Sequence, residues 1–240
     1  MRLFICLFLL STLSACGHRG IPPEITALHT LPSKVPAYFK PEVIIIDAGH
    51  GGKDAGASSK RYAYEEKQMT LETAFLVSDY LKKLGYKTLM TRKQDVFVPL
   101  DTRAEIANSI DADLFVSIHY NYSPSREAEG IEIFYYKEDK TNPSERIVQS
   151  KALGQEVLKK VVKNTGAESR GIKPGNLAVV RQTKMPAILV EAGFLSNPTE
   201  LEKLKDPKYI QSLAKGIAHG IDQYLTNNRS RRDSNARPAA

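Results

Sequence analysis

Cysteine is scarce in this sequence, because only Cys6 and Cys16 occur among its 240 residues. Both lie close to the start, so the rest of the chain has no thiol for a disulfide, a cysteine nucleophile or a thiolate metal site. A long apolar run is also missing. The run from Leu3 to Leu10 is well short of the roughly 18 to 20 residues that a membrane-spanning helix needs. The sequence therefore argues against a fold held together by disulfides and against a membrane-spanning helix.

The first residues have instead the pattern of an export signal. A basic Arg2, the short apolar run and small residues before Cys16 predict a signal peptide over residues 1–15. Leu13-Ser14-Ala15-Cys16 resembles the lipobox of bacterial lipoproteins, which implies a lipidated Cys16 as the mature N-terminus and a membrane anchor. The alternative is an ordinary cleavable signal that happens to end near a cysteine. We expect an exported, membrane-anchored lipoprotein facing the periplasm or cell-wall space.

Two segments beside the predicted domain have a biased composition. Residues 16–41 contain five prolines and little periodicity, which suits an extended tether. Residues 227–240 are polar and basic, and we expect them to be disordered. The formal charge is +7, of which this tail supplies +3 and Arg2 supplies +1. No Lys/Arg stripe with interleaved aromatics occurs in the remainder, so the sequence does not indicate nucleic-acid binding.

Residues 42–226 show the alternation of a single α/β domain. β-Branched and apolar runs predict strands at 43–47, 86–91, 113–119, 131–136, 177–181 and 187–191. Helical spacing and caps predict helices at 66–84, 99–108, 144–164 and 207–225, with another starting at Asn197. Strands that alternate with helices predict a mostly parallel central sheet of about six strands with helices on both faces. The 131–136 strand alternates enough for an edge or antiparallel position.

Three titratable residues end apolar strands, where ligands collect in open α/β sheets. His50 follows the first strand, His119 ends the third and Glu191 ends the last. Singly, each histidine has an ordinary explanation as a turn residue or a strand end. Together, two imidazoles and a carboxylate form a usual ligand set for catalytic zinc. The other histidines are expected to be structural or solvated: His18, His29 and His219.

Two other motifs are weaker. The glycines of residues 49–56 lack G-x-G-x-x-G spacing and no Walker lysine-serine pair follows, which argues against a phosphate site. Ser212 and Lys215 fit the S-x-x-K pattern of penicillin-recognising serine enzymes. However, no clear S-D-N or K-T-G partner occurs, and Ser and Lys are common on exposed helical faces.

Four ordered segments resemble the motifs of the type 3 amidases, which are zinc-dependent N-acetylmuramoyl-L-alanine amidases. They are IIIDAGHGGKDAGA at 44–57, YEEKQMTL at 64–71, DLFVSIHYN at 113–121 and MPAILVEAGFLSN at 185–197. The resemblance covers about Val43 to Leu225. The chain departs from the family where Ala48 replaces a frequent proline and Gln68 replaces the usual aspartate. Tyr120 and Tyr122 likewise replace smaller residues.

The resemblance implies an activity and a set of site residues. His50, Glu66 and His119 would bind Zn²⁺ and Glu191 would be catalytic, with Glu65 as a neighbouring competitor of Glu66. Asn121 and Arg181 lie in family-like positions, where we expect substrate contacts. The bond cleaved would be the amide between N-acetylmuramic acid and L-alanine of peptidoglycan or muropeptides, in cell-wall remodelling or daughter-cell separation.

Two rival functions use the same residues: a binding module that recognises peptidoglycan without cutting it, and a zinc peptidase that acts within stem peptides. The presence of all four site residues argues against the first, whereas metal chemistry alone does not exclude the second. Some relatives carry an inserted helix over the zinc, but the interval from Tyr136 to Ser144 leaves no room for one. We therefore expect an uncovered site that needs no activator, in a monomer.

Overall fold

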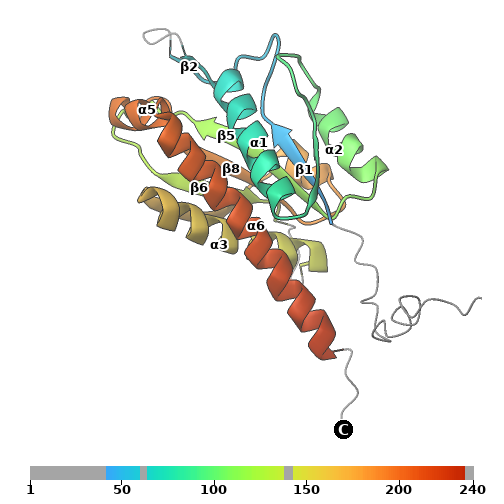
Figure 1. Ribbon diagram of the computed structural model, residues 1–240. Helices are drawn as coiled ribbons and strands as arrows, with labels where there is room; N and C mark the ends of the chain where they lie inside the picture. The colour runs from blue at the N-terminus through green and yellow to red at the C-terminus, as the bar shows by residue number, and fades with distance from the viewer. Residues whose placement is uncertain (1–41, 60–63, 138–142, 236–240) are drawn as a thin grey trace, which may run out of the picture. The chain divides into compact units, whose positions relative to one another are not determined.

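The computed structural model describes residues 42–59, 64–137 and 143–235. The predicted signal peptide, the lipidation of Cys16, the tether, His18 and His29 lie outside these residues. Figure 1 shows one central sheet with helices packed against it. Its strands, in spatial order, are β4 (Lys87–Met90), β1 (Val43–Ala48), β5 (Leu114–Asn121), β8 (Ala187–Phe194), β6 (Ile131–Tyr135) and β7 (Ser169–Pro174).

The sheet is mostly parallel, as predicted. Strand β1 pairs in parallel with β4 and β5, and β5 pairs in parallel with β8. Strand β6 is antiparallel to β8 and parallel to β7. The predicted antiparallel position of the 131–136 strand is therefore confirmed, but it is not an edge, because β7 lies outside it. Ile44, Ile45 and Ile46 of β1 are fully buried, as expected for a strand covered on both faces.

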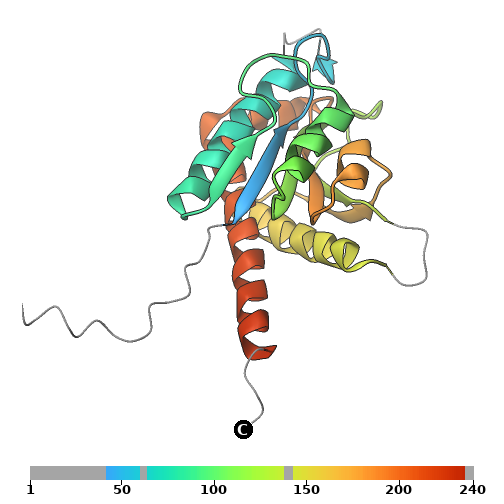
Figure 2. The same ribbon diagram turned by 90° about the vertical axis from the view of Figure 1, so that its right-hand side faces the viewer.

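Helices cover both faces of the sheet, which Figures 1 and 2 show from two sides. The larger core lies between the sheet and three long helices: α1 (Glu66–Lys83), α3 (Glu145–Thr165) and α6 (Pro207–Asn235). The smaller core on the other face lies under α2 (Leu100–Ser109) and α4 (Ala178–Gln182). A short α5 (Pro198–Leu204) follows β8, and a small antiparallel pair is formed by β2 (Ser58–Ser59) and β3 (Tyr64–Glu65).

The predicted strand at 177–181 is wrong, because these residues form the start of α4, whose Val179 and Val180 are buried in the smaller core. The sixth strand is β7 instead. The prediction of a disordered tail from 227 is also wrong as far as Asn235, because α6 continues to that residue. Arg229 on this extension donates to the hydroxyl of Tyr86 at 2.7 Å. No helix within the described residues is long and apolar enough to cross a membrane.

Candidate metal centre

The first histidine lies in a turn that requires glycine. Strand β1 ends at Ala48, and His50 has a left-handed backbone with φ of 61°. A Cβ on Gly49 would lie 2.3 Å from the His119 ring, which is far inside van der Waals contact. The glycine therefore lets the turn approach the second histidine closely, which is the reason for at least one glycine of this motif.

Two buried arginines donate hydrogen bonds to backbone carbonyls of this turn. Arg103 of α2 donates from Nη2 to the carbonyl of His50 at 2.6 Å and from Nη1 to Asp47 at 2.7 Å. Arg92, which follows β4, donates from Nη2 to the carbonyl of Gly49 at 2.8 Å. Both arginines are at most 3% exposed. Their guanidinium groups satisfy carbonyls that leave the sheet ladder and so fix the path of the turn.

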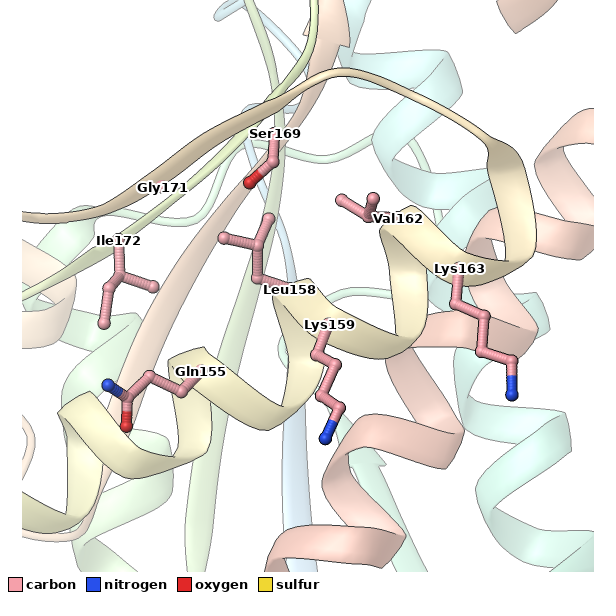
Figure 3. A pocket seen from close by; sticks show the side chains of 8 residues that line it. All are labelled: Gln155, Leu158, Lys159, Val162, Lys163, Ser169, Gly171 and Ile172. Atoms are coloured by element: carbon pink, nitrogen blue, oxygen red, sulfur yellow. The ribbon is translucent and has the colours of Figure 1, made fainter.

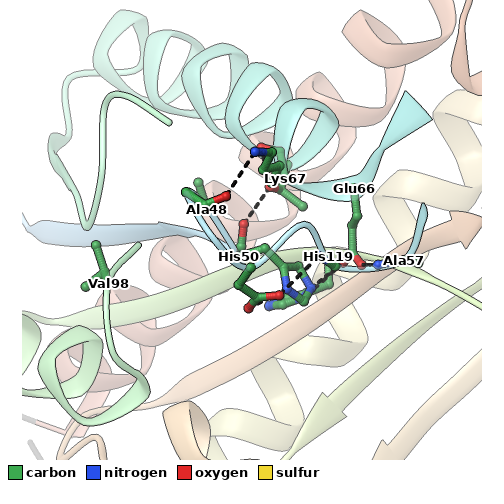
Figure 4. Close-up of polar contacts among 12 residues, drawn as sticks. Ala48, His50, Ala57, Glu66, Lys67, Val98 and His119 are labelled. Carbon is green, nitrogen blue, oxygen red and sulfur yellow. Dashed lines mark hydrogen bonds and ion pairs between the residues drawn. The ribbon is translucent and has the colours of Figure 1, made fainter. Parts of the chain in front are cut away.

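His50, Glu66 and His119 come together at the carboxyl end of the sheet (Figure 4). Glu66 Oε1 lies 3.0 Å from His50 Nε2 and 3.0 Å from His119 Nδ1. The two histidine nitrogens are 3.1 Å apart. Ligand atoms on a tetrahedral zinc with bonds of about 2.0–2.2 Å lie roughly 3.3–3.6 Å apart, slightly farther than these atoms. The nitrogens His50 Nε2 and His119 Nδ1 and the oxygen Glu66 Oε1 thus form a donor triangle that fits a divalent metal of the zinc class.

Asp54 orients the first of these histidines. Its Oδ2 lies 2.9 Å from His50 Nδ1. When Nδ1 donates this hydrogen bond, a neutral His50 presents the lone pair of Nε2 to the donor triangle. Burial lowers the pKa of His50, but Glu66 and Asp54 outweigh it, so the pKa is raised from 6.5. The sequence analysis missed Asp54, although it lies in the same glycine-rich motif as His50.

Glu66, rather than Glu65, lies beside the histidines. It is the first residue of α1 and is 3% exposed. Its Oε2 accepts from the amide of Ala57 at 2.8 Å and its Oε1 from the amide of Tyr120 at 3.0 Å. Burial raises the pKa of Glu66, but the hydrogen bonds with the two histidines dominate and lower it to about 2. The Glu65 carboxylate instead lies 3.3 Å from Lys67 Nζ.

Glu191 lies in β8 beside the donor triangle, opposite His119 of the neighbouring strand. Its Oε2 is buried and has no hydrogen-bond partner among the residues that the structure describes. Burial raises its pKa to about 7. A carboxyl group with one unpaired oxygen and a pKa near neutrality is suited to exchanging protons. The sequence prediction of a convergent His50, His119 and Glu191 is thus met by their placement.

A cavity of about 440 Å³ joins these four residues. Asn121 and Tyr122 also line it. Arg181 is not among its lining residues; it lies on α4 and donates to Asn176 at 2.6 Å. Ser212 of the S-x-x-K pattern donates to the backbone carbonyl of Lys208 on its own helix at 2.9 Å.

A second cavity of about 440 Å³ lies between α3 and β7 (Figure 3). Leu158, Val162 and Ile172 form its apolar wall, and Lys159 and Lys163 lie at its margin. Its lining residues include no carboxylate and no imidazole. The residues suited to metal binding and proton transfer therefore lie around the first cavity.

Fold and site together define an α/β domain with a candidate metal centre for hydrolysis. The family described as N-acetylmuramoyl-L-alanine amidase matches residues 44–223, and the chain belongs to this family. Its relatives include "Probable cell wall amidase LytH" of Staphylococcus epidermidis, 34% identical over 79% of this chain and 60% of that protein. The chain thus spans less than two thirds of that relative.

Solved structures of N-acetylmuramoyl-L-alanine amidases are similar to this chain in both sequence and fold. An N-acetylmuramoyl-L-alanine amidase from Clostridium difficile 630 is 37% identical, with a TM-score of 0.72 over 78% of this chain and 97% of that one. The catalytic domain of CwlV, an N-acetylmuramoyl-L-alanine amidase from Bacillus (Paenibacillus) polymyxa, is 38% identical, with a TM-score of 0.70 over 77% and 98% of the two chains.

Proposed function

We propose that this protein is a zinc-dependent amidase that cleaves the bond between N-acetylmuramic acid and L-alanine in peptidoglycan. The observation that carries the proposal is the triangle of His50, Glu66 and His119 beside the buried carboxyl of Glu191, in a member of this amidase family. The substrate would enter the cavity that these residues line.

His50, Glu66 and His119 would hold the metal, with Glu66 as the anionic ligand. Zinc held there would supply a Lewis acid and would lower the pKa of a bound water to about 7. Glu191 takes a proton from the attacking water and delivers it to the departing amine of L-alanine. Its buried, unpartnered Oε2 and its pKa of about 7 suit both steps, because the group can accept and release a proton near neutral pH.

Product analysis on purified muropeptides tests this proposal. Mass spectrometry should find free stem peptides that begin with L-alanine, together with peptide-free glycan. Shortened peptides that remain attached to glycan would instead identify a peptidase. Glu191→Ala should retain zinc and lose turnover, whereas His119→Ala should lose both. A Glu191→Ala protein with normal activity would contradict the catalytic assignment.

The same proposal includes an export route and an anchor. Leu13-Ser14-Ala15-Cys16 supports removal of residues 1–15 and lipidation of Cys16. One relative is named "Probable cell wall amidase LytH", which suits an exported enzyme in cell-wall remodelling or daughter-cell separation. Mass spectrometry of the mature N-terminus measures the lipid directly, and Cys16→Ala should release the protein from membranes. A membrane-bound Cys16→Ala protein would contradict the anchor.

We also propose that the site needs no activator and that the enzyme is a monomer. The interval between β6 and α3 is short, which supports an uncovered cavity. Purified protein should therefore cut muropeptides by itself and elute as a single copy in size-exclusion chromatography with light scattering. Activity that starts only after another protein is added would contradict an uncovered site.

A further inference from the structure

A second carboxylate lies beside Glu191 on the same face of the sheet. Glu132 of β6 is directly opposite Glu191 in the antiparallel pairing with β8, so the two side chains share a face. Glu132 is 6% exposed. Its Oε1 accepts from the amide nitrogen of Asn121, a cavity-lining residue, at 2.7 Å. Glu132 is thus tied directly to the wall of the site.

Two cations from β7 converge on the other oxygen of Glu132. Arg170 Nε and Lys173 Nζ lie 2.9 Å and 2.5 Å from Oε2. Arg170 also lies over the Phe194 ring, with its guanidinium carbon 4.9 Å from the ring centroid. Burial raises the pKa of Glu132, but the two cations outweigh it and hold the pKa below its usual range. The cluster of Glu132, Arg170 and Lys173 therefore has one anion and two cations.

The surplus positive charge of this cluster faces solvent. The side chain of Glu132 is 7% exposed, whereas those of Arg170 and Lys173 are 35% and 39% exposed. Lys173 is opposite Phe134, and Phe134 is opposite Leu189, which lines the cavity of the site. Register thus places Lys173 on the cavity face. A buried carboxylate holds two accessible cations together at this margin, which is a suitable arrangement for binding a second carboxylate.

We propose that Arg170 and Lys173 form a subsite for a carboxylate of the stem peptide. This inference rests on the proposed function, because the departing stem peptide is the acidic part of the substrate next to the cleaved bond. Arg170 also donates from Nη1 to the carbonyl of Glu129 at 3.2 Å. The ligand carboxylate takes donors that neither Glu132 nor this carbonyl occupies, and Glu132 keeps both cations in place. The subsite favours substrates with free carboxylates over those whose carboxyl groups are amidated.

The test compares two muropeptides that differ in one respect: the stem-peptide carboxyls are free in one and amidated in the other. Wild type should cleave the free acid with the higher kcat/KM. Lys173→Gln and Arg170→Gln should each lower kcat/KM for the free acid about tenfold, mainly through KM, because one charge-assisted contact is lost. Both should leave the amidated substrate nearly unchanged. Each variant keeps one cation on Glu132, which favours normal folding.

Lys159→Gln on α3 is the matched control, because it removes the same charge from a lysine beside the other cavity. Equal losses on both substrates, or no loss on either, would overturn the subsite. If wild type cleaves neither substrate at the N-acetylmuramic acid bond, the proposed function fails instead. Calorimetric binding of the free and amidated stem peptides then tests the subsite by itself. Tighter binding of the free acid that Lys173→Gln abolishes supports it, and equal binding overturns it.

Discussion

At the residue scale, Asp54 lies outside the donor triangle but orients one of its members, the His50 ring, by a hydrogen bond to Nδ1. Removing the carboxylate in Asp54→Ala frees the His50 ring to rotate and to change tautomer. We expect the zinc dissociation constant to rise about 10- to 100-fold, the usual effect of losing such a partner. The Asp54 side chain is 44% exposed, so the fold should persist. Competition with a chromogenic chelator measures the affinity.

Asp79→Ala provides the control, because Asp79 is an exposed carboxylate of α1 with a side chain that is 62% exposed. It should bind zinc as wild type does. Unchanged affinity in Asp54→Ala would show that the turn and its arginines orient His50 without help.

Glu191 is expected to destabilise the metal-free protein at alkaline pH. Its pKa is about 7 in the fold against a reference value of 4.5, because burial disfavours the charged carboxylate. Between these values the folded protein binds more protons than the unfolded chain, so the free energy of unfolding falls as pH rises. The full effect, roughly 3–4 kcal/mol, is reached above about pH 7 and is absent below about pH 4.5.

Glu191→Gln removes this charge, so chelator-treated Glu191→Gln should be more stable than wild type at pH 8 and similar to it at pH 4.5. Urea unfolding at both pH values measures the difference. Glu105→Gln on the exposed side of α2 controls for the loss of an acid. Equal stability of Glu191→Gln and wild type at pH 8 would mean that the carboxylate finds a partner when it ionises.

At the scale of elements, the sequence predicted the helices and strands whose apolar residues recur at regular local spacing. The long helices α1 and α3 and the buried strands follow from apolar spacing. His50 follows β1, but His119 and Glu191 lie inside β5 and β8, which continue to Asn121 and Phe194 beyond the predicted strand ends. Strand β7 was missed because its residues, SRGIKP, are polar and half exposed. Its role follows from pairing with β6, which is a tertiary contact. Arg103 was missed for the same reason, because it contacts Asp47 and His50 more than 50 residues away. Asp54 was missed although it contacts His50 only four residues away.

Helix α6 depends on close contact with α3 through two glycines. A Cβ on Gly216 would lie 2.7 Å from the Cα of Val161, and one on Gly220 would lie 2.4 Å from the Cα of Val157. Helix propensity alone predicts that Gly220→Ala stabilises a helix by about 1 kcal/mol. We expect the opposite sign, a loss of about 1–3 kcal/mol, because the helices must move apart. Thermal unfolding measures the change.

Thr226→Ala is the matched control for this substitution, because Thr226 is an exposed position of the same helix. The stability of Thr226→Ala shows the effect of helix propensity at a position away from the contact between α3 and α6. A Gly220→Ala protein that is more stable than wild type would show that α3 and α6 tolerate the added methyl group.

At the scale of the whole molecule, the candidate metal centre joins parts of the chain that are distant in sequence. His50 follows β1, Glu66 begins α1 and His119 lies in β5. A ligand that binds the folded state alone stabilises it by about 2.7 kcal/mol at 100 times its dissociation constant. For a domain of this size, about 1 kcal/mol corresponds to roughly 2–4 °C in Tm. Chelation should therefore lower Tm by roughly 5–10 °C, and added zinc should restore it.

The variants separate metal binding from catalysis in this experiment. His119→Ala should have a Tm that does not respond to zinc, because the donor triangle is incomplete. Glu191→Gln should respond as wild type does while remaining inactive, because Glu191 is assigned to proton transfer and not to the metal. A zinc-dependent Tm in His119→Ala would place the stabilising ion elsewhere in the chain. If the Tm of Glu191→Gln no longer responded to zinc, Glu191 would instead be a metal ligand. The roles assigned to Glu66 and Glu191 would then have to be exchanged.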